Sequence, residues 1–295
     1  PPAKLNLFLE LMARRADGYH DIDTVMVQIE WCDEMRVRRL PHESIDLRVD
    51  WLPSTQVVSQ RLGVDPSSDV LAIPSDNKNL VHQALATFRD AFDVDGGFEC
   101  DLGKNIPAGA GLGGASSDAA SALRCAADLC GIPPDAQQLH EIASSIGSDV
   151  PFFLGLGSDD SITAARATGR GERLEAVDLS TPLDCVVVFP GVTLSTGKVY
   201  ADSHAPQVPQ NACRLITLLE SGDSKNLADE MLNRLTLPAK KLAPQIDEIL
   251  ESLWRMGLRT CQLTGSGSAC FAIASSPSEA RRVAAQAQAL MEPGA

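Results

Sequence analysis

Apolar and polar positions alternate at the start of the chain, and this pattern predicts a β-rich beginning. Residues 3–13 predict the first strand. Its two faces consist of Ala3, Leu5, Leu7, Leu9 and Leu11 and, opposite them, of Lys4, Asn6, Phe8 and Glu10. The segments 24–31, 34–40 and 44–50 predict three further strands, and residues 53–77, rich in Pro, Ser and Asp, predict an irregular excursion.

Helical spacing appears next, in residues 79–92. A strand over residues 98–106 then leads into a glycine-rich loop. Two helices are predicted after this loop, at about 116–130 and at about 135–146, the second with Asp135 as its N-cap.

The order of elements changes beyond residue 157. Short strands are predicted at 161–166 and 184–189, and a strand interrupted by glycines at 260–274. The predicted helices lie near 211–220, 225–235, 240–256 and 277–291. We therefore expect an N-terminal α/β unit of residues 1–157 and a helix-rich α+β unit of residues 158–295.

The glycine-rich loop, NIPAGAGLGGASSDAASALRC at residues 105–125, imitates two phosphate-binding motifs. The dinucleotide-binding motif requires a parallel βαβ unit, but here a second helix follows the first. The P-loop motif requires a lysine where Ala115 stands. Backbone N–H groups of such a loop still converge at a helix N-terminus, and Ser116 and Ser117 offer a cap or hydroxyl ligands. The loop therefore predicts phosphate binding without its own lysine.

Lys4 is a candidate for the missing cation, because it shares the polar face of the first strand with Asn6. A lysine in such a strand is more often an edge residue, unless it faces a cleft and pairs with a carboxylate. Asp149 is a candidate partner, although sequence spacing alone does not bring the two together.

Charge and composition narrow the function classes. The formal net charge is −14 and basic clusters are short, which disfavours polymeric nucleic acid as a partner. No apolar run is long enough to cross a bilayer, so we expect a cytoplasmic protein without a membrane partner. The eight cysteines form no C-x-x-C motif and the five histidines no ligand-like pair, so reduced thiols and no metal site are expected.

At this point the chain resembles the GHMP kinases, whose ATP loop is similar to PAGAGLGGASSDAA. Further segments are similar to the branch of that family that phosphorylates 4-diphosphocytidyl-2-C-methyl-D-erythritol. These segments are PAKLNLFLELMARRADGYHDIDTVM, IGSDVPFFL, FPGVTLSTGKVY and LTGSGSACFA.

The resemblance implies a two-domain α/β kinase, with an N-terminal unit like domain 2 of ribosomal protein S5 and a ferredoxin-like, helix-rich C-terminal unit. It implies that Asp149 is the catalytic base and Lys4 its partner. It places the ATP phosphates on Pro107, Ala108, Gly109, Ala110, Gly111, Leu112, Gly113, Gly114, Ala115, Ser116 and Ser117, with Asn79 and Lys104 near the nucleotide. It places the cytidylyl substrate on Asn6, Tyr19, His20, Thr196 and Tyr200.

No carboxylate cluster in the sequence marks a metal site, so we expect Mg²⁺ to arrive with ATP. Asp118 departs from the pattern, because it adds negative charge beside the phosphate loop where asparagine is frequent. Two other functions stay open: a kinase of homoserine, mevalonate or a sugar, and a nucleotide-binding regulator without activity. Tyr19, His20 and Tyr200 favour a substrate with a base to stack, while Lys4 with Asp149 disfavours a pure regulator. The oligomeric state is not predicted.

Overall fold

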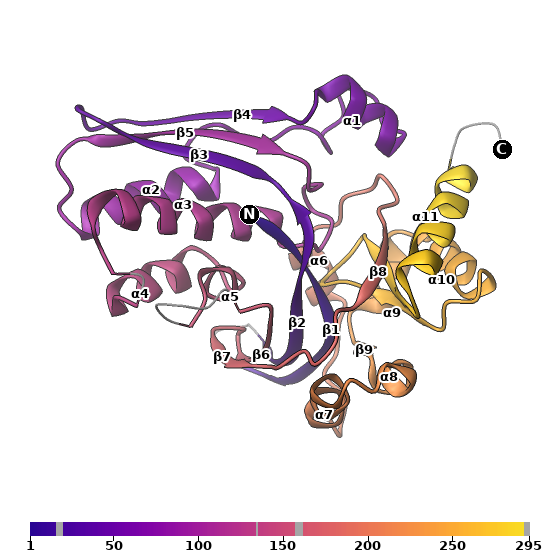
Figure 1. Cartoon of the computed structure of the whole chain (residues 1–295). Coiled ribbons are helices and arrows are strands. Elements are labelled where there is room, and N and C mark those ends of the chain that lie inside the picture. Colours follow the sequence, from indigo (N-terminus) through magenta and orange to yellow (C-terminus); the bar gives the residue numbers. More distant parts are fainter. Residues whose placement is uncertain (16–19, 134, 157–161, 292–295) are drawn as a thin grey trace.

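A computed structural model describes residues 1–15, 20–133, 135–156 and 162–291 of the chain (Figure 1). The strands are β1 (Pro2–Arg14), β2 (His20–Cys32), β3 (Glu34–Leu40), β4 (Ile45–Trp51), β5 (Gly97–Lys104), β6 (Ala164–Gly169), β7 (Arg173–Ala176), β8 (Asp184–Val188), β9 (Leu232–Asn233), β10 (Thr260–Leu263) and β11 (Cys270–Ala274). The helices are α1 (Thr55–Leu62), α2 (Leu80–Ala91), α3 (Gly114–Cys130), α4 (Gln137–Ile146), α5 (Val150–Leu154), α6 (Thr196–Ala201), α7 (Cys213–Ser221), α8 (Leu227–Glu230), α9 (Thr236–Leu242), α10 (Gln245–Arg255) and α11 (Pro277–Met291).

The described strands form three sheets. The largest has the order β7-β6-β2-β1-β9, and the others have the orders β3-β5-β4 and β10-β11-β8. The strands β6, β7 and β9 follow residue 157 in the chain, yet they join the sheet that β1 and β2 begin. The domain boundary at residue 157 therefore stays a prediction, since one sheet contains strands from both sides of it.

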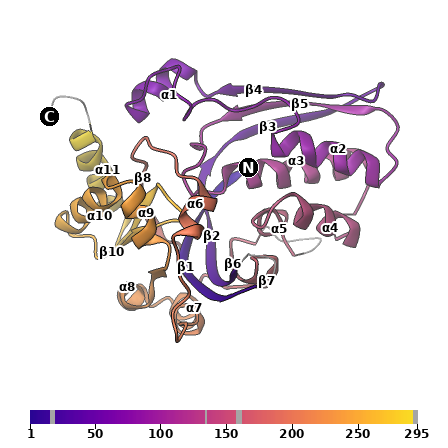
Figure 2. The same cartoon turned by 180° about the vertical axis from the view of Figure 1, so that it is seen from behind.

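Layers of helix and sheet surround the long β1–β2 hairpin (Figures 1 and 2). The β3-β5-β4 sheet covers α2 and α3, with α4 and α5 beyond them, while α7 to α11 lie on the other side of the hairpin. The N-terminal core packs Phe98 of the sheet against Phe88 of α2, Leu123 of α3 and Phe152 of α5. Burying each such side chain contributes about 1.5–3 kcal/mol, so this core fixes the position of α3 against β5.

The alternation predicted for the first strand is wrong beyond its middle. The pairing of β1 with β2 shifts by one residue between Asn6 and Phe8, which marks a β-bulge. Ala3, Leu5, Leu7 and Phe8 consequently pack in one apolar cluster, and Leu9 and Leu11 pack in a different one. After the bulge Leu9 lines the same cavity as Lys4 and Asn6. The odd-numbered residues therefore face away from the cavity before the bulge and toward it at Leu9.

The predicted irregular excursion over residues 53–77 contains the helix α1. Ser54 caps its first turn by accepting a hydrogen bond from the Val57 N–H, and Gly63 ends it with a left-handed φ of 63°. The prediction rests on the average composition of the segment, which is dominated by Pro, Ser and Asp, and it therefore overlooks these two capping residues. The expectation of a wholly irregular segment is therefore wrong.

Other helix boundaries also differ from the sequence prediction. The N-cap of α4 is Ala136 rather than Asp135. The helix predicted over 225–235 is the four-residue α8 followed by β9, and Ala243 and Pro244 divide the helix predicted over 240–256 into α9 and α10. Helix α6 and strand β7 are short and show no clear period of apolar residues, so the sequence does not predict them. Within the described chain, no helix has the length and apolarity that a membrane span requires.

Candidate active site

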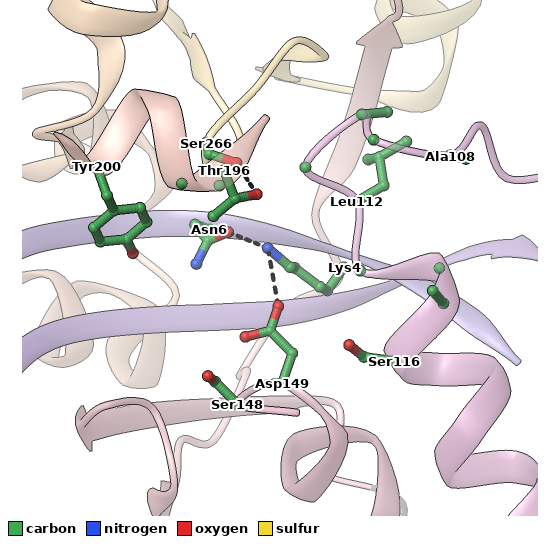
Figure 3. Close-up of a pocket in the computed structure, with 18 of the residues that line it drawn as sticks. Lys4, Asn6, Ala108, Leu112, Ser116, Ser148, Asp149, Thr196, Tyr200 and Ser266 are labelled. Carbon is green, nitrogen blue, oxygen red and sulfur yellow. Dashed lines mark hydrogen bonds and ion pairs between the residues drawn. The ribbon is translucent and has the colours of Figure 1, made fainter. Parts of the chain in front are cut away.

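A cavity of about 1110 Å³ lies where β1, β2, the glycine loop, α6 and the turn after β10 meet. It is lined at one end by the glycine loop and at the other by His20 and Tyr200. Lys4 and Asp149 lie between these two ends (Figure 3). Segments from both ends of the sequence therefore build one continuous space.

The glycine loop turns its carbonyl groups away from ligands. The carbonyls of residues 109, 110 and 112 accept backbone hydrogen bonds from Leu194, Ala269 and Lys4, at 3.4, 3.0 and 2.9 Å. Left-handed φ angles of 63°, 78° and 73° at Gly109, Gly111 and Gly113 make this alternation feasible. Among the described residues, none accepts a hydrogen bond from the N–H groups of residues 108–116. Free N–H groups at the N-terminus of α3 form a site suited to phosphate.

Helix α3 begins two residues earlier than predicted, and its N-cap is Gly113 with no side-chain cap. The prediction that Ser116 or Ser117 caps the helix is therefore wrong. Ser117 Oγ is buried and has no hydrogen-bond partner among the described residues. The half-buried Ser116 lines the cavity instead, so of the two serines only Ser116 has a hydroxyl that can reach a ligand there.

Lys4 is buried and meets two polar groups of the cavity. Its Nζ donates a hydrogen bond of 2.5 Å to Asn6 Oδ1 and lies 3.6 Å from Asp149 Oδ2. Burial lowers the pKa of the Lys4 ammonium, and the nearby Asp149 carboxylate opposes that effect. Asp149 is the residue before α5 and makes no side-chain cap, so its carboxylate is free to face the cavity (Figure 3).

The opposite end of the cavity contains an aromatic pair. The ring centroids of His20 and Tyr200 are 6.3 Å apart, and burial raises the pKa of the Tyr200 hydroxyl. Thr196 begins α6, and its Oγ1 lies 2.9 Å from Ser266 Oγ, a hydrogen bond that joins α6 to the turn after β10. Tyr19, the second predicted stacking residue, lies outside the described residues.

Asn79 and Lys104 line the cavity, but each already has structural partners. Asn79 caps α2 by accepting the Val81 N–H and donates to the Pro74 carbonyl. The Lys104 ammonium contacts both Asp33 and Asp118. Both residues therefore line the same cavity as the glycine loop, and both side chains already make contacts within the protein.

Sequence reasoning missed several lining residues, above all the turn at residues 264–267. Thr264 Oγ1 accepts the Asn6 N–H and lies 3.4 Å from the Gly111 carbonyl, so this turn contacts both Lys4's strand and the glycine loop. The glycines of LTGSGSACFA signal a turn, but not its partners. Other unpredicted lining residues include the polar side chains of Arg14, Ser148, Arg170 and His204.

Comparison with known families and proteins agrees with this geometry. A family model described as the GHMP kinases N terminal domain matches residues 79–165, and one described as GHMP kinases C terminal matches residues 215–292. A 4-diphosphocytidyl-2-C-methyl-D-erythritol kinase of Rhodopirellula baltica is 46% identical, over 95% of this chain and 87% of that protein. The enzyme of the same name from Prosthecochloris aestuarii is 34% identical, over 97% of this chain and 92% of that protein.

Solved structures of kinases also match nearly the whole chain. A crystal structure of 4-(cytidine 5'-diphospho)-2C-methyl-D-erythritol kinase matches with a TM-score of 0.74 and 31% identity, over 98% of this chain and 94% of the other. A homoserine kinase from Cytophaga hutchinsonii matches with a TM-score of 0.61 and 17% identity, over 98% and 90%. The second likeness concerns the fold alone.

Proposed function

Because the chain belongs to the GHMP kinase family, and within it to the 4-diphosphocytidyl-2-C-methyl-D-erythritol kinases, we propose the corresponding reaction for it. The chain transfers the γ-phosphoryl group of ATP to the 2-hydroxyl of 4-diphosphocytidyl-2-C-methyl-D-erythritol. This reaction belongs to isoprenoid synthesis by the non-mevalonate route.

One observation supports this proposal most directly: the Lys4–Asp149 pair lies between a phosphate-binding loop and an aromatic end of the same cavity. Pockets for a single drug-sized ligand measure roughly 300–1,000 Å³, so a cavity of about 1110 Å³ has room for two substrates that meet head to head. The His20–Tyr200 pair suits a base, because ring faces and a ring nitrogen supply stacking and hydrogen bonding.

The residues divide the reaction between them. The acceptor hydroxyl oxygen attacks the γ-phosphorus, the bond from that phosphorus to the β-bridging oxygen breaks, and ADP leaves. Asp149 accepts the hydroxyl proton, and Lys4, held by Asn6, stabilises the charge that develops on the oxygen. The free N–H groups of the glycine loop hold the ATP phosphates in line with the hydroxyl.

Mg²⁺ is proposed to enter with ATP. The described residues contain no group of three carboxylate, histidine or cysteine side chains able to hold a metal. This fits a cation bound mainly by phosphates and water, with the Ser116 hydroxyl in the cavity as one protein oxygen within reach. When bound, Mg²⁺ would neutralise charge on the phosphates.

An assay of ADP release tests the proposed acceptor. We expect turnover with 4-diphosphocytidyl-2-C-methyl-D-erythritol and none above background with homoserine, mevalonate or galactose. Tyr200→Ala should weaken binding of the cytidylyl substrate by about 1–3 kcal/mol, whereas Tyr200→Phe, which keeps the ring face, should bind normally. Preference for another alcohol, or equal binding by Tyr200→Ala, would favour a different GHMP kinase activity.

A further inference from the structure

A second charged cluster lies beneath the glycine loop and takes no part in the proposed chemistry. It consists of Asp33, between β2 and β3, Lys104, the last residue of β5, and Asp118, in the second turn of α3. Their side chains are 0%, 4% and 4% exposed, respectively. The Lys104 ammonium contacts Asp33 Oδ2 and lies 2.6 Å from Asp118 Oδ2. We call these three residues the buried triad.

The buried triad contacts both flanks of the glycine loop. Asp33 Oδ1 accepts the N–H groups of Asn105 and Ile106, at 2.5 and 2.8 Å, where the chain leaves β5. Asp118 belongs to α3, where the loop ends. One ammonium therefore joins the strand that enters the loop to the helix that leaves it.

Packing at Gly114 shows how closely the helix approaches this cluster. A Cβ at Gly114 would lie 3.0 Å from Ile106 Cγ2 and 3.4 Å from Lys104 Nζ. The first turn of α3 therefore sits directly on the buried triad. A change in the spacing within the cluster would therefore move the N–H groups that face the cavity.

The charges of the buried triad do not balance when both carboxylates are ionised, since one ammonium faces two of them. Asp118 Oδ1 is buried and has no hydrogen-bond partner among the described residues. Burial, with a smaller effect of Asp33, raises the pKa of Asp118 to about 7, against the opposing charge of Lys104. An isolated structural ion pair would not need the second, incompletely satisfied carboxylate.

We propose that the buried triad is a clamp that fixes the spacing between the two flanks of the glycine loop and thereby positions its N–H groups for the phosphates of ATP. Asp33, Lys104 and Asp118 are positioning residues in this role, which rests on the proposed use of ATP. Lys104 acts through the loop and not on ATP directly, because two carboxylates already occupy its ammonium.

Two substitutions of Asp118 distinguish the effect of its hydrogen bond to Lys104 from the effect of its negative charge. Asp118→Asn and Asp118→Ala both remove the negative charge, but only asparagine keeps an oxygen that accepts from Lys104. We expect Asp118→Ala to raise the Kd of ATP, measured by calorimetry, about 10-fold or more, since small misplacements of a bound group are costly. Asp118→Asn should stay within about twofold of the unsubstituted chain.

Glu99→Gln serves as the matched control. Glu99 lies on the same strand as Lys104 and pairs with Arg38 and Arg48, on the side of the sheet where both arginines are exposed. Its substitution should leave the Kd of ATP unchanged. Thermal unfolding of each variant shows that the protein measured is folded.

The outcomes are distinct. A lower Tm of Asp118→Ala with an unchanged Kd of ATP would make the cluster merely structural and overturn the clamp. Equal weakening in Asp118→Asn and Asp118→Ala would also overturn it, because charge would then be the cause. Failure of the unsubstituted chain to bind ATP would overturn the proposed function itself, together with the clamp.

Discussion

At the scale of single residues, the burial of Lys4 decides what the site can do. An ammonium removed from water loses solvation, and among the described residues Asn6 and Asp149 replace it, at 2.5 and 3.6 Å. A carboxylate held beside such a cation, with its side chain 34% exposed, can receive a proton from an incoming hydroxyl.

Asp149→Asn tests that role. Turnover should fall roughly 10²-fold or more, because an amide cannot accept the proton, while the Kd of ATP stays unchanged. ADP release at saturating substrates and calorimetry with ATP measure the two quantities. Asp101→Asn, at a side chain that is 41% exposed and lies on β5, is the control. Turnover of Asp149→Asn close to normal would remove Asp149 as the base.

The sequence predicts the alternation that turns Lys4 and Asn6 to one face, because local sterics impose a period of two on a strand. It does not predict that Asp149 lies beside Lys4, since this contact depends on how α5 packs under α3. Nor does local pattern predict the bulge after Asn6, which moves Leu9 into the cavity. Resemblance to the kinases, rather than periodicity, linked Lys4 to Asp149.

At the scale of elements, the glycine loop and the turn after β10 depend on each other. A Cβ at Gly111 would lie 2.2 Å from the Thr264 carbonyl oxygen, and the φ at Gly111 is 78°. No side chain fits there unless the loop separates from the turn.

Gly111→Ala should therefore raise the KM for ATP about 10-fold or more, as the N–H groups shift from their phosphate positions. Gly131→Ala is the matched control, because Gly131 ends the same helix α3 with a φ of 68° and open space around it. The control should show only the conformational cost, about 1 kcal/mol of stability, without an effect on the KM for ATP. Equal ATP kinetics for Gly111→Ala and the unsubstituted chain would place the phosphates elsewhere.

Most strands and long helices are predictable from the sequence, because each carries its own period of apolar residues. Exceptions occur where a single residue decides the outcome. Gly113 is the N-cap of α3, so the serines that follow it wrongly predict a later start of the helix. Helix α1 depends on the capping residues Ser54 and Gly63 within a polar segment.

At the scale of the whole molecule, the excess negative charge of the buried triad affects the stability of the fold. The pKa of Asp118 rises from its ordinary 3.8 to about 7 on folding, so the folded chain keeps a proton that the unfolded chain has released. Between these pH values, this group makes the fold less stable as the pH rises.

We expect the Tm of the unsubstituted chain to fall relative to that of Asp118→Asn as the pH rises from about 4 to about 7. Above about pH 7 the difference between the two Tm values should stay constant. Lys104 and Asp33, which face Asp118, are present in both proteins, so the difference reports Asp118 together with its coupling to these two groups. Calorimetric unfolding of both proteins at several pH values measures this difference in Tm. A constant difference in Tm across this range would show that Asp118 does not titrate there.

The order β7-β6-β2-β1-β9 has a consequence for synthesis on the ribosome. The hairpin of β1 and β2 emerges before β6 and β9, which cover its two edges and are complete only after residues 169 and 233 have been made. Until then both edges present unpaired backbone groups that invite association with other chains. The sheet that contains the hairpin is therefore completed only after β6 and β9 have been synthesised, and Lys4 on β1 becomes enclosed at that late stage.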